Sequence, residues 1–368
     1  MLTIPLGEVF RIYIGNDIAI RLQDVIVGLS GLLFITISIK NKSFPKNYLN
    51  KPLIIFIFLG LFSLIINSFK LSLNQFFASS LYLPRWVCYA LVYFVVVGVD
   101  KKFKKNILII LFIDGLLILL AGFVQYFLYP NLRNLYYLGW DEHSSRMFSV
   151  FFDPNFAGAF FVLFFLFLAG SVHFHLREKK QRDAVILSLI AVLTVAATFL
   201  TYSRSAILMF AVGFSTYLIL INRKKFLLFL FGAIAIVIIL LSPTFNKEST
   251  NLFRTASSIA RLETYSSSIK IIQDHPLLGI GFNTYRYAQQ AYGFRGVGTE
   301  FPSHGDSGTD NSFLFVAATT GIFGLLAYLF MWFKILNHAF WVYNKKNSIL
   351  SIVLISSSIG LFIDSFFY

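Results

Sequence analysis

Cysteine is almost absent from this chain. Cys88 is the only one among 368 residues, and it lies within a long apolar run. A disulfide framework and a cysteine metal site are therefore excluded. We interpret Cys88 as a small buried apolar residue.

The sequence motifs of nucleotide-using enzymes are also absent. The chain contains neither GxxxxGK[ST] nor Asp-x-Asp, so ATP hydrolysis or sugar transfer from a cytoplasmic nucleotide donor is not expected. His173 and His175 stand two residues apart, but no third or fourth ligand is near them in sequence. We interpret them as residues at the end of a membrane span. The sequence thus predicts no metal ion and no cofactor.

Charge is scarce, and hydrophobic residues dominate. Charged residues make up 13% of the chain and hydrophobic residues 57%, with a mean hydropathy of +0.74. These values exclude a soluble globular domain. Runs long enough to cross a bilayer as helices recur along the chain, at about 20–39, 52–69, 76–99, 106–129, 149–172, 183–201, 205–221, 226–242, 311–333 and 348–368. The predicted fold class is all-α, a polytopic bundle of transmembrane helices.

The basic residues concentrate in every second loop between the apolar runs. This alternation is typical of membrane topology and argues against nucleic acid as the partner. The loops after spans one, three, five, seven and nine each carry three or four Lys or Arg residues, whereas the short loops between them carry one or two. The positive-inside rule therefore places the basic loops in the cytoplasm. The long polar segment 243–310 then lies outside, between helices in 1–242 and helices in 311–368. No cleavable signal peptide is evident, and a further span is expected beyond each end.

Polar groups gather at the helix starts that this topology places at the outer face. They are Arg85 in span three, Asp153 and Asn155 at span five, Arg204 at span seven, and Asn311 at span nine. Helix capping is one interpretation, since Asp153, Ser203 and Asp310 all suit the N-cap position. The other is an anion site, because helix N-termini attract phosphate and arginine binds it in a bidentate manner. Snorkelling to lipid headgroups is the alternative for the arginines.

The outer loop combines a predicted helix with a glycine-rich segment. Residues 255–273 show apolar positions at helical spacing. If that helix extended further back, Arg254 and Arg261 would share one of its faces and could hold an anion or a headgroup. Residues 292–308 hold five glycines and His304. His304 is either an ordinary loop residue or a base that accepts a hydroxyl proton.

Four motifs, taken in order, resemble the O-antigen ligase and O-antigen polymerase superfamily. They are RMFSVFFDPNFAGAF, YSRSA, HPLLGIGFNTYR and TDNSFLFVAATTGIFGLLAY. The resemblance implies about a dozen helices, a large periplasmic loop in the bacterial inner membrane, and an undecaprenyl-diphosphate-linked glycan as donor. It implies that Arg204 contacts the diphosphate, assisted by Arg254 or Arg261. In ligases a histidine precedes the last motif's asparagine as the base; here Asp310 stands there, so the base is either His304 or Asp310.

The hypothesis from the sequence is a membrane glycosyltransferase that joins lipid-linked oligosaccharide repeats outside the cell membrane. Arg85, Arg204 and Arg261 would hold the diphosphate. Asp310 stands where ligases have a histidine, and a glycine-rich segment precedes it. Both features favour a polymerase over a ligase that acts on the lipid A core. A flippase of the same lipid-linked sugars and an inert assembly scaffold are the rival classes. The bilayer, a flippase and a chain-length regulator are the expected partners.

Overall fold

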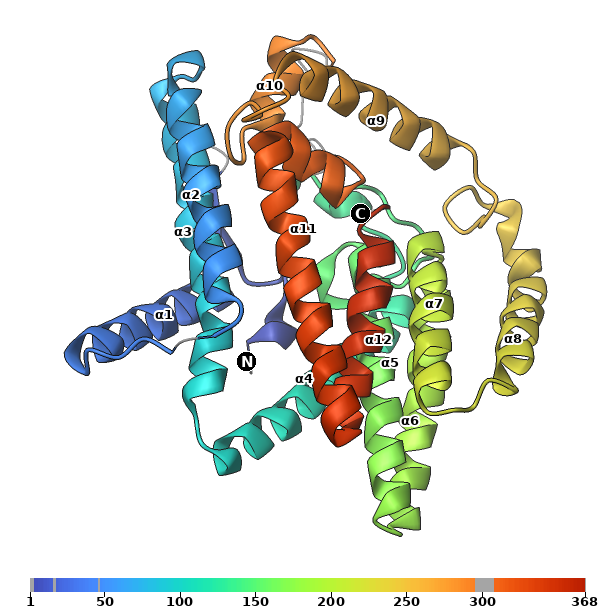
Figure 1. The fold of residues 1–368 in the computed structure, drawn as a ribbon. Coiled ribbons are helices and arrows are strands. Elements are labelled where there is room, and N and C mark those ends of the chain that lie inside the picture. The colour runs from blue at the N-terminus through green and yellow to red at the C-terminus, as the bar shows by residue number, and fades with distance from the viewer. Residues whose placement is uncertain (1–2, 16–17, 46, 295–307, 368) are drawn as a thin grey trace. The chain divides into compact units, whose positions relative to one another are not determined.

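The computed structural model describes residues 3–15, 18–45, 47–294 and 308–367. Seven helices in this part of the chain are long and apolar enough to cross a membrane, and three apolar helices are shorter. Together these ten helices coincide with the ten apolar runs, so the predicted all-α polytopic fold is confirmed. Figure 1 labels the helices, which are α1 (Leu22–Lys40), α2 (Asn50–Ile66), α3 (Leu73–Gly98), α4 (Lys101–Leu128), α5 (Pro154–Arg177), α6 (Gln181–Leu200), α7 (Arg204–Leu220), α8 (Phe226–Leu241), α11 (Ser312–Lys346) and α12 (Ile349–Asp364).

Further elements lie outside the apolar runs. The predicted loop helix is present as α9 (Ala256–Asp274), and a short helix, α10 (Tyr285–Ala291), follows it. The N-terminal segment forms an antiparallel pair of strands, β1 (Arg11–Gly15) and β2 (Ile18–Arg21), which the sequence did not predict. Short 3-10 turns occur at Ile4–Leu6, Ser68–Lys70, Arg133–Leu138, Ser149–Phe151 and Ser242–Asn246.

The chain divides into two compact units that do not follow its order. The first contains Met1–Asp114 and Leu262–Lys334, and the second contains Gly115–Arg261 and Ile335–Tyr368. Each unit therefore combines early and late helices, and the long polar segment contributes to both.

In the second unit α5, α6, α7 and α12 pack side by side (Figure 1). Glycines in α7 and α12 allow the backbones of these two helices to approach closely. A Cβ at Gly213 of α7 would lie 3.3 Å from the Ser356 carbonyl of α12, and one at Gly360 would lie 3.3 Å from the Met209 carbonyl. Helices in lipid gain stability from such close backbone contact, since burial of apolar surface offers little there.

In the first unit a break in α11 is joined to the segment before α10. Gly321 has φ 68° and ψ −172°, so α11 is kinked at this residue. The freed backbone groups pair with the HPLLGIG segment: Ile280 donates to the Ala318 carbonyl at 3.0 Å, and Ile322 donates to the Pro276 carbonyl at 2.9 Å. Irregular backbone within an apolar bundle is stable only when its polar groups are satisfied in this way.

Two polar side chains of α2 complete this junction. The Ser63 hydroxyl is 2.6 Å from the Leu278 carbonyl and 2.9 Å from that of Thr319. The Asn67 amide donates to the Gly279 carbonyl at 3.1 Å. The junction therefore places the start of α10 and the N-terminal part of α11 in one unit.

We expect Gly321→Ala to destabilise the protein. The new Cβ would clash with the Leu277 carbonyl group. The backbone of Gly321, with φ 68° and ψ −172°, also lies in a region that is essentially restricted to glycine, and such a conformation costs an L-residue about 1–3 kcal/mol. Thermal unfolding in detergent measures the effect. Gly28→Ala in α1 is the matched control, because its Cβ meets nothing within 4 Å. Equal melting temperatures for both variants would contradict this account of the kink.

Candidate functional site

The turn between α6 and α7 is the centre of the polar region in the second unit. Thr201, Tyr202 and Ser203 are all almost fully buried. Tyr202 adopts a left-handed conformation with φ 49°, which reverses the chain within three residues. Ser203 caps α7 by accepting a hydrogen bond from the Ala206 amide at 3.4 Å, as the sequence predicted.

Two buried arginines hold the carbonyl groups of this turn. The Arg146 Nε donates to the Thr201 carbonyl at 2.8 Å, and its Nη2 lies 3.5 Å from the Tyr202 carbonyl and 3.4 Å from Asn155 Oδ1. The Arg254 Nη1 donates to the same Tyr202 carbonyl at 3.2 Å. Arg146 and Arg254 are only 5% and 8% exposed. The turn is thus clamped between the segment before α5 and the loop before α9.

Gln125 of α4 positions the Arg146 segment. Its Oε1 accepts hydrogen bonds from the Phe148 and Ser149 amides at 2.8 and 3.0 Å. Its Nε2 donates to the Arg146 carbonyl at 3.3 Å. Beside these bonds, the Met147 amide donates to the Leu200 carbonyl at 2.9 Å. The backbone around Arg146 is therefore fixed by Gln125 of α4 and by Leu200 of α6, and this directs the Arg146 side chain to the turn.

Arg204, the first residue of α7, turns towards the beginning of α9. Its Nη1 donates to the Ser258 hydroxyl at 2.9 Å, and its Nη2 donates to the Ser257 hydroxyl at 2.8 Å. The Arg254 Nε donates to the same Ser257 hydroxyl at 3.1 Å. Because α9 begins at Ala256, Arg254 precedes the helix and does not share a helical face with Arg261. The serines bring Arg204 and Arg254 together instead.

Every hydrogen bond of Arg146, Arg204 and Arg254 within the described residues goes to a neutral oxygen. The acceptors are backbone carbonyls, serine hydroxyls and the Asn155 amide. Arg261 is half-buried and lies within electrostatic range of all three. The hydrogen bonds of Arg146, Arg204 and Arg254 thus hold three positive charges without a carboxylate acceptor, although Asp153 and the exposed Glu248 lie within electrostatic range.

Burial and the neighbouring positive charges lower the pKa of Arg146 and Arg254, the two arginines that lie outside the helices. Burial, followed by the charge of Arg254, lowers the pKa of Arg146 to about 9. Burial and then Arg204 lower the pKa of Arg254 to about 10. Both guanidinium groups remain protonated at neutral pH. An anion bound among them would relieve this repulsion, because an opposite charge favours the charged form.

Three further titratable residues lie near the arginines. Asp153 caps α5 and accepts hydrogen bonds from the Asn155 and Phe156 amides at 2.7 and 3.3 Å. Asp364 of α12 is buried beside Ser205, within electrostatic range of Arg261 and Asp153. Burial and then Arg146 lower the pKa of His143 to about 4, so this imidazole is neutral at pH 7.

The remaining predicted site residues belong to the first unit. Arg85 forms an ion pair with Asp24 at 2.9 Å, and the Tyr89 hydroxyl donates to the same carboxylate at 2.7 Å. This pairing accounts for an arginine within the apolar helix α3. Its contact with a diphosphate stays a prediction.

Asn311 caps α11, because its Oδ1 accepts hydrogen bonds from the Phe313 and Leu314 amides at 2.9 and 3.0 Å. The prediction that Asp310 occupies the N-cap is therefore wrong: Asn311 is the residue immediately before the helix. The Asp310 carbonyl accepts a hydrogen bond from Tyr265 at 3.0 Å. His304 lies outside the described residues.

Sequence reasoning missed two groups of residues in this site. Arg146 was not considered as a site residue, although it lies seven residues before Asp153 of the DPN motif. His143 and the Ser257–Ser258 pair were not considered. The available signal was that Arg146 is the first residue of the motif RMFSVFFDPNFAGAF. The partners of the serines depend on how α9 meets α7, and local spacing does not encode that.

The described residues contain no group of three or more His, Cys, Asp or Glu side chains that could hold a metal ion. What the cluster offers is a set of fixed guanidinium groups beside a helix N-terminus. Such an arrangement suits binding of a phosphate or diphosphate.

Residues 189–329 match a family model described as O-antigen ligase. The match begins within α6 and ends within α11, so it contains the α6–α7 turn, Arg204, Arg254, Arg261 and the TDN motif. No curated protein matches the chain. The resemblance to the O-antigen ligase and polymerase superfamily predicted from the motifs is confirmed. Members of this family are glycosyltransferase-like enzymes.

We expect Arg146→Gln to destabilise the fold strongly. The substitution removes a charged donor from two buried carbonyl groups, and hydrogen bonds to charged groups are each worth about 1.5–3 kcal/mol. The melting temperature in detergent should fall by several degrees. Arg133→Gln is the control: Arg133 is 77% exposed and pairs with Glu142, and exposed pairs contribute at most about 1 kcal/mol. An Arg146 variant as stable as the control would mean that the turn does not depend on Arg146.

Proposed function

We propose that this chain, which carries an O-antigen ligase family domain over residues 189–329, polymerises lipid-linked oligosaccharide repeats. The donor is a growing glycan on undecaprenyl diphosphate, and the acceptor is the next repeat on its own carrier. The product is O-antigen, capsule or exopolysaccharide. The reaction takes place at the outer face of the bacterial inner membrane, where the topology from the basic loops places the outer loop and Arg204.

The arginine cluster is the observation that supports this proposal most. Arg204 and Arg254 share the Ser257 hydroxyl, and among the described residues their hydrogen bonds go to neutral oxygens. A diphosphate carries the charge that such a cluster lacks, and guanidinium groups bind its oxygens in a bidentate manner. The N-terminal end of α7, where Arg204 lies, adds the positive end of a helix dipole.

The chemical step replaces one bond at the anomeric carbon of the donor sugar. The acceptor hydroxyl oxygen forms the new bond to that carbon, and the bond from the carbon to the diphosphate oxygen breaks. The bonding electron pair leaves with the diphosphate, whose negative charge increases as it departs. Arg204, with Arg254 and Arg261, stabilises this charge, which is the kind of electrostatic assistance that lowers a barrier most.

The acceptor hydroxyl loses its proton to a general base. His304 and Asp310 are the two candidates that the resemblance offers. A positioned base contributes about 10²–10⁴-fold to such reactions. Because the diphosphate is a good leaving group, orientation of the two lipid-linked sugars supplies much of the remaining acceleration.

We expect Arg204→Gln to abolish long surface polysaccharide. Loss of one preorganised donor to a developing oxyanion typically costs about 10²–10³ in rate. Cells should then accumulate single repeats on the lipid carrier at the outer leaflet. The length distribution of surface polysaccharide and the lipid-linked pool are the measurements, with Arg133→Gln as the control that should retain normal chains.

The same experiment separates the rival functions. A ligase would leave full-length polymer on the lipid carrier when Arg204 is changed. A flippase would leave single repeats on the cytoplasmic leaflet. Normal long chains from a well-expressed Arg204→Gln variant would refute the diphosphate contact and would favour an inert scaffold.

The base is tested by His304→Ala and Asp310→Asn in parallel. We expect one of them to reduce polymerisation by about 10²-fold or more while the protein still expresses and binds lipid-linked donor. The other should retain most of its activity. If both variants polymerise normally, neither residue is the base.

A further inference from the structure

A cavity of about 590 Å³ lies in the second unit, at the ends of its helices remote from Arg204. It is lined by the C-terminal turns of α5 and α7, by the first half of α6, and by Tyr343, Asn347 and Ile352 of α11, α12 and their connection. The 17 residues of α7 place it about 25 Å from Arg204, at about 1.5 Å per residue. The cavity is thus a separate site from the arginine cluster.

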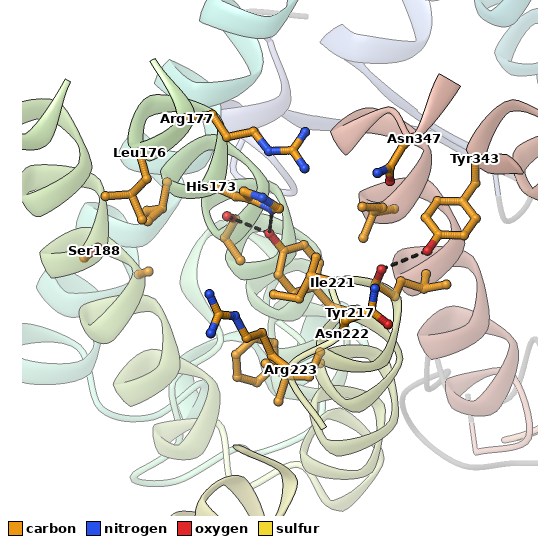
Figure 2. Close-up of a pocket in the computed structure, with 17 residues that line it drawn as sticks. His173, Leu176, Arg177, Ser188, Tyr217, Ile221, Asn222, Arg223, Tyr343 and Asn347 are labelled. Carbon is orange, nitrogen blue, oxygen red and sulfur yellow. Dashed lines mark hydrogen bonds between the residues drawn. The ribbon is translucent and has the colours of Figure 1, made fainter. Parts of the chain in front are cut away.

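The walls of the cavity are largely apolar, and its charged lining is basic. Ala169, Val172, Phe214 and Leu218 are among the apolar lining residues. The lining also contains Arg177, Arg223 and His173, but no Asp or Glu. In Figure 2 the side chains of Arg177 and Arg223 extend above and below His173. The cavity therefore combines apolar surface with two guanidinium groups of the same sign.

Two tyrosines in the cavity lining form hydrogen bonds with neighbouring helices. The Tyr217 hydroxyl donates to the Ala169 carbonyl at 3.0 Å and lies 3.3 Å from His173 Nδ1. The Tyr343 hydroxyl donates to the Leu220 carbonyl at 2.9 Å. Figure 2 shows these bonds as dashed lines within the cavity lining. Tyr217 thus orients the His173 ring, and the two tyrosines tie the helices that line the cavity to one another.

The backbone positions Arg223 at the rim. Asn222 takes a left-handed conformation with φ 57° after α7, and the Arg223 amide then donates to the Leu218 carbonyl at 2.8 Å. Arg177 lies one helical turn after His173 on α5, so both face the same side. Within the described part of the chain neither arginine makes a side-chain hydrogen bond or an ion pair.

A helix dipole alone would favour a cation at the end of α5. It requires neither a cavity beneath that cation nor a second arginine, from the loop after α7, that lines the same cavity. The apolar rim is a further constraint: Leu176 lines the cavity and is 56% exposed. Apolar surface that is exposed beside two unpaired guanidinium groups suits an amphiphile better than a small polar anion.

We propose that this cavity binds an anionic phospholipid of the leaflet that faces the Lys/Arg-rich loops. Arg177 and Arg223 hold the headgroup phosphate, and an acyl chain lies along the apolar wall beside Leu176. Basic pockets between transmembrane helices on that side are recognised by anionic headgroups. The site is independent of the proposed glycan transfer.

The test uses the full-length protein in detergent, titrated with phosphatidylglycerol or with phosphatidylcholine of the same acyl chains. Bound lipid is counted by native mass spectrometry, and the melting temperature is recorded. We expect phosphatidylglycerol to bind and stabilise the protein more than phosphatidylcholine does. In Arg177→Gln/Arg223→Gln its affinity should fall about tenfold or more, because a lost charge-assisted hydrogen bond is worth at least one decade.

The matched control is Lys180→Gln/Lys224→Gln, which removes two charges from the same loops but not from the cavity lining. It should bind phosphatidylglycerol like the unchanged protein. Equal loss in both double variants, or no preference for phosphatidylglycerol in the unchanged protein, would overturn the proposal. Equal stabilisation by inorganic phosphate would also overturn it, because the ligand would then be the free anion.

If the double variant does not purify, Arg223→Gln alone serves, since Arg223 lies on an exposed loop. No glycan donor is present in this experiment. A failure of the polymerase proposal therefore leaves the lipid result unchanged, and a failure here leaves polymerisation unaffected.

Discussion

The second unit depends on two guanidinium groups that hold the carbonyl oxygens of one turn. Thr201 and Tyr202 reverse the chain between α6 and α7, and this turn is buried. Arg146 and Arg254 supply its hydrogen bonds from two distant segments. A buried carbonyl without a donor would be costly, and a buried arginine without acceptors would cost more. Each group therefore requires the other, and Arg204 takes its position from the same turn.

The same contacts that stabilise the turn also create the chemistry of the site. If carboxylates neutralised these arginines, an anionic substrate would have to displace them. Neutral partners fix the direction of each guanidinium group and leave its charge for the diphosphate that we propose as its ligand. The cost is that burial, followed by the charges of neighbouring arginines, lowers the pKa of Arg146 and Arg254. The junction in the first unit follows a similar logic, since a broken α11 is stabilised by the backbone of residues 276–281.

Much of the fold could be predicted because the bilayer imposes simple rules on sequence. Each apolar run of sufficient length became an apolar helix, and the amphipathic spacing after Thr255 became α9. The N-cap roles of Asp153 and Ser203 were also predictable, since capping depends on neighbouring residues only. At α11 this local reasoning chose Asp310, but the helix begins one residue later and Asn311 is the cap. Caps can be recognised by type more reliably than by exact position.

What the sequence by itself determined was the class of protein, the positions of the membrane helices and the resemblance to a known family. These follow from hydropathy, charge asymmetry and motif order, which are all properties of the chain read in one dimension. Only the tertiary structure decided which basic residues act together. It brought Arg146 to the turn before Arg204, paired Arg85 with Asp24, and opened a basic cavity between Arg177 and Arg223. The physical reason is that a buried charge must find its partner across helices, and partners far apart in sequence leave no local pattern.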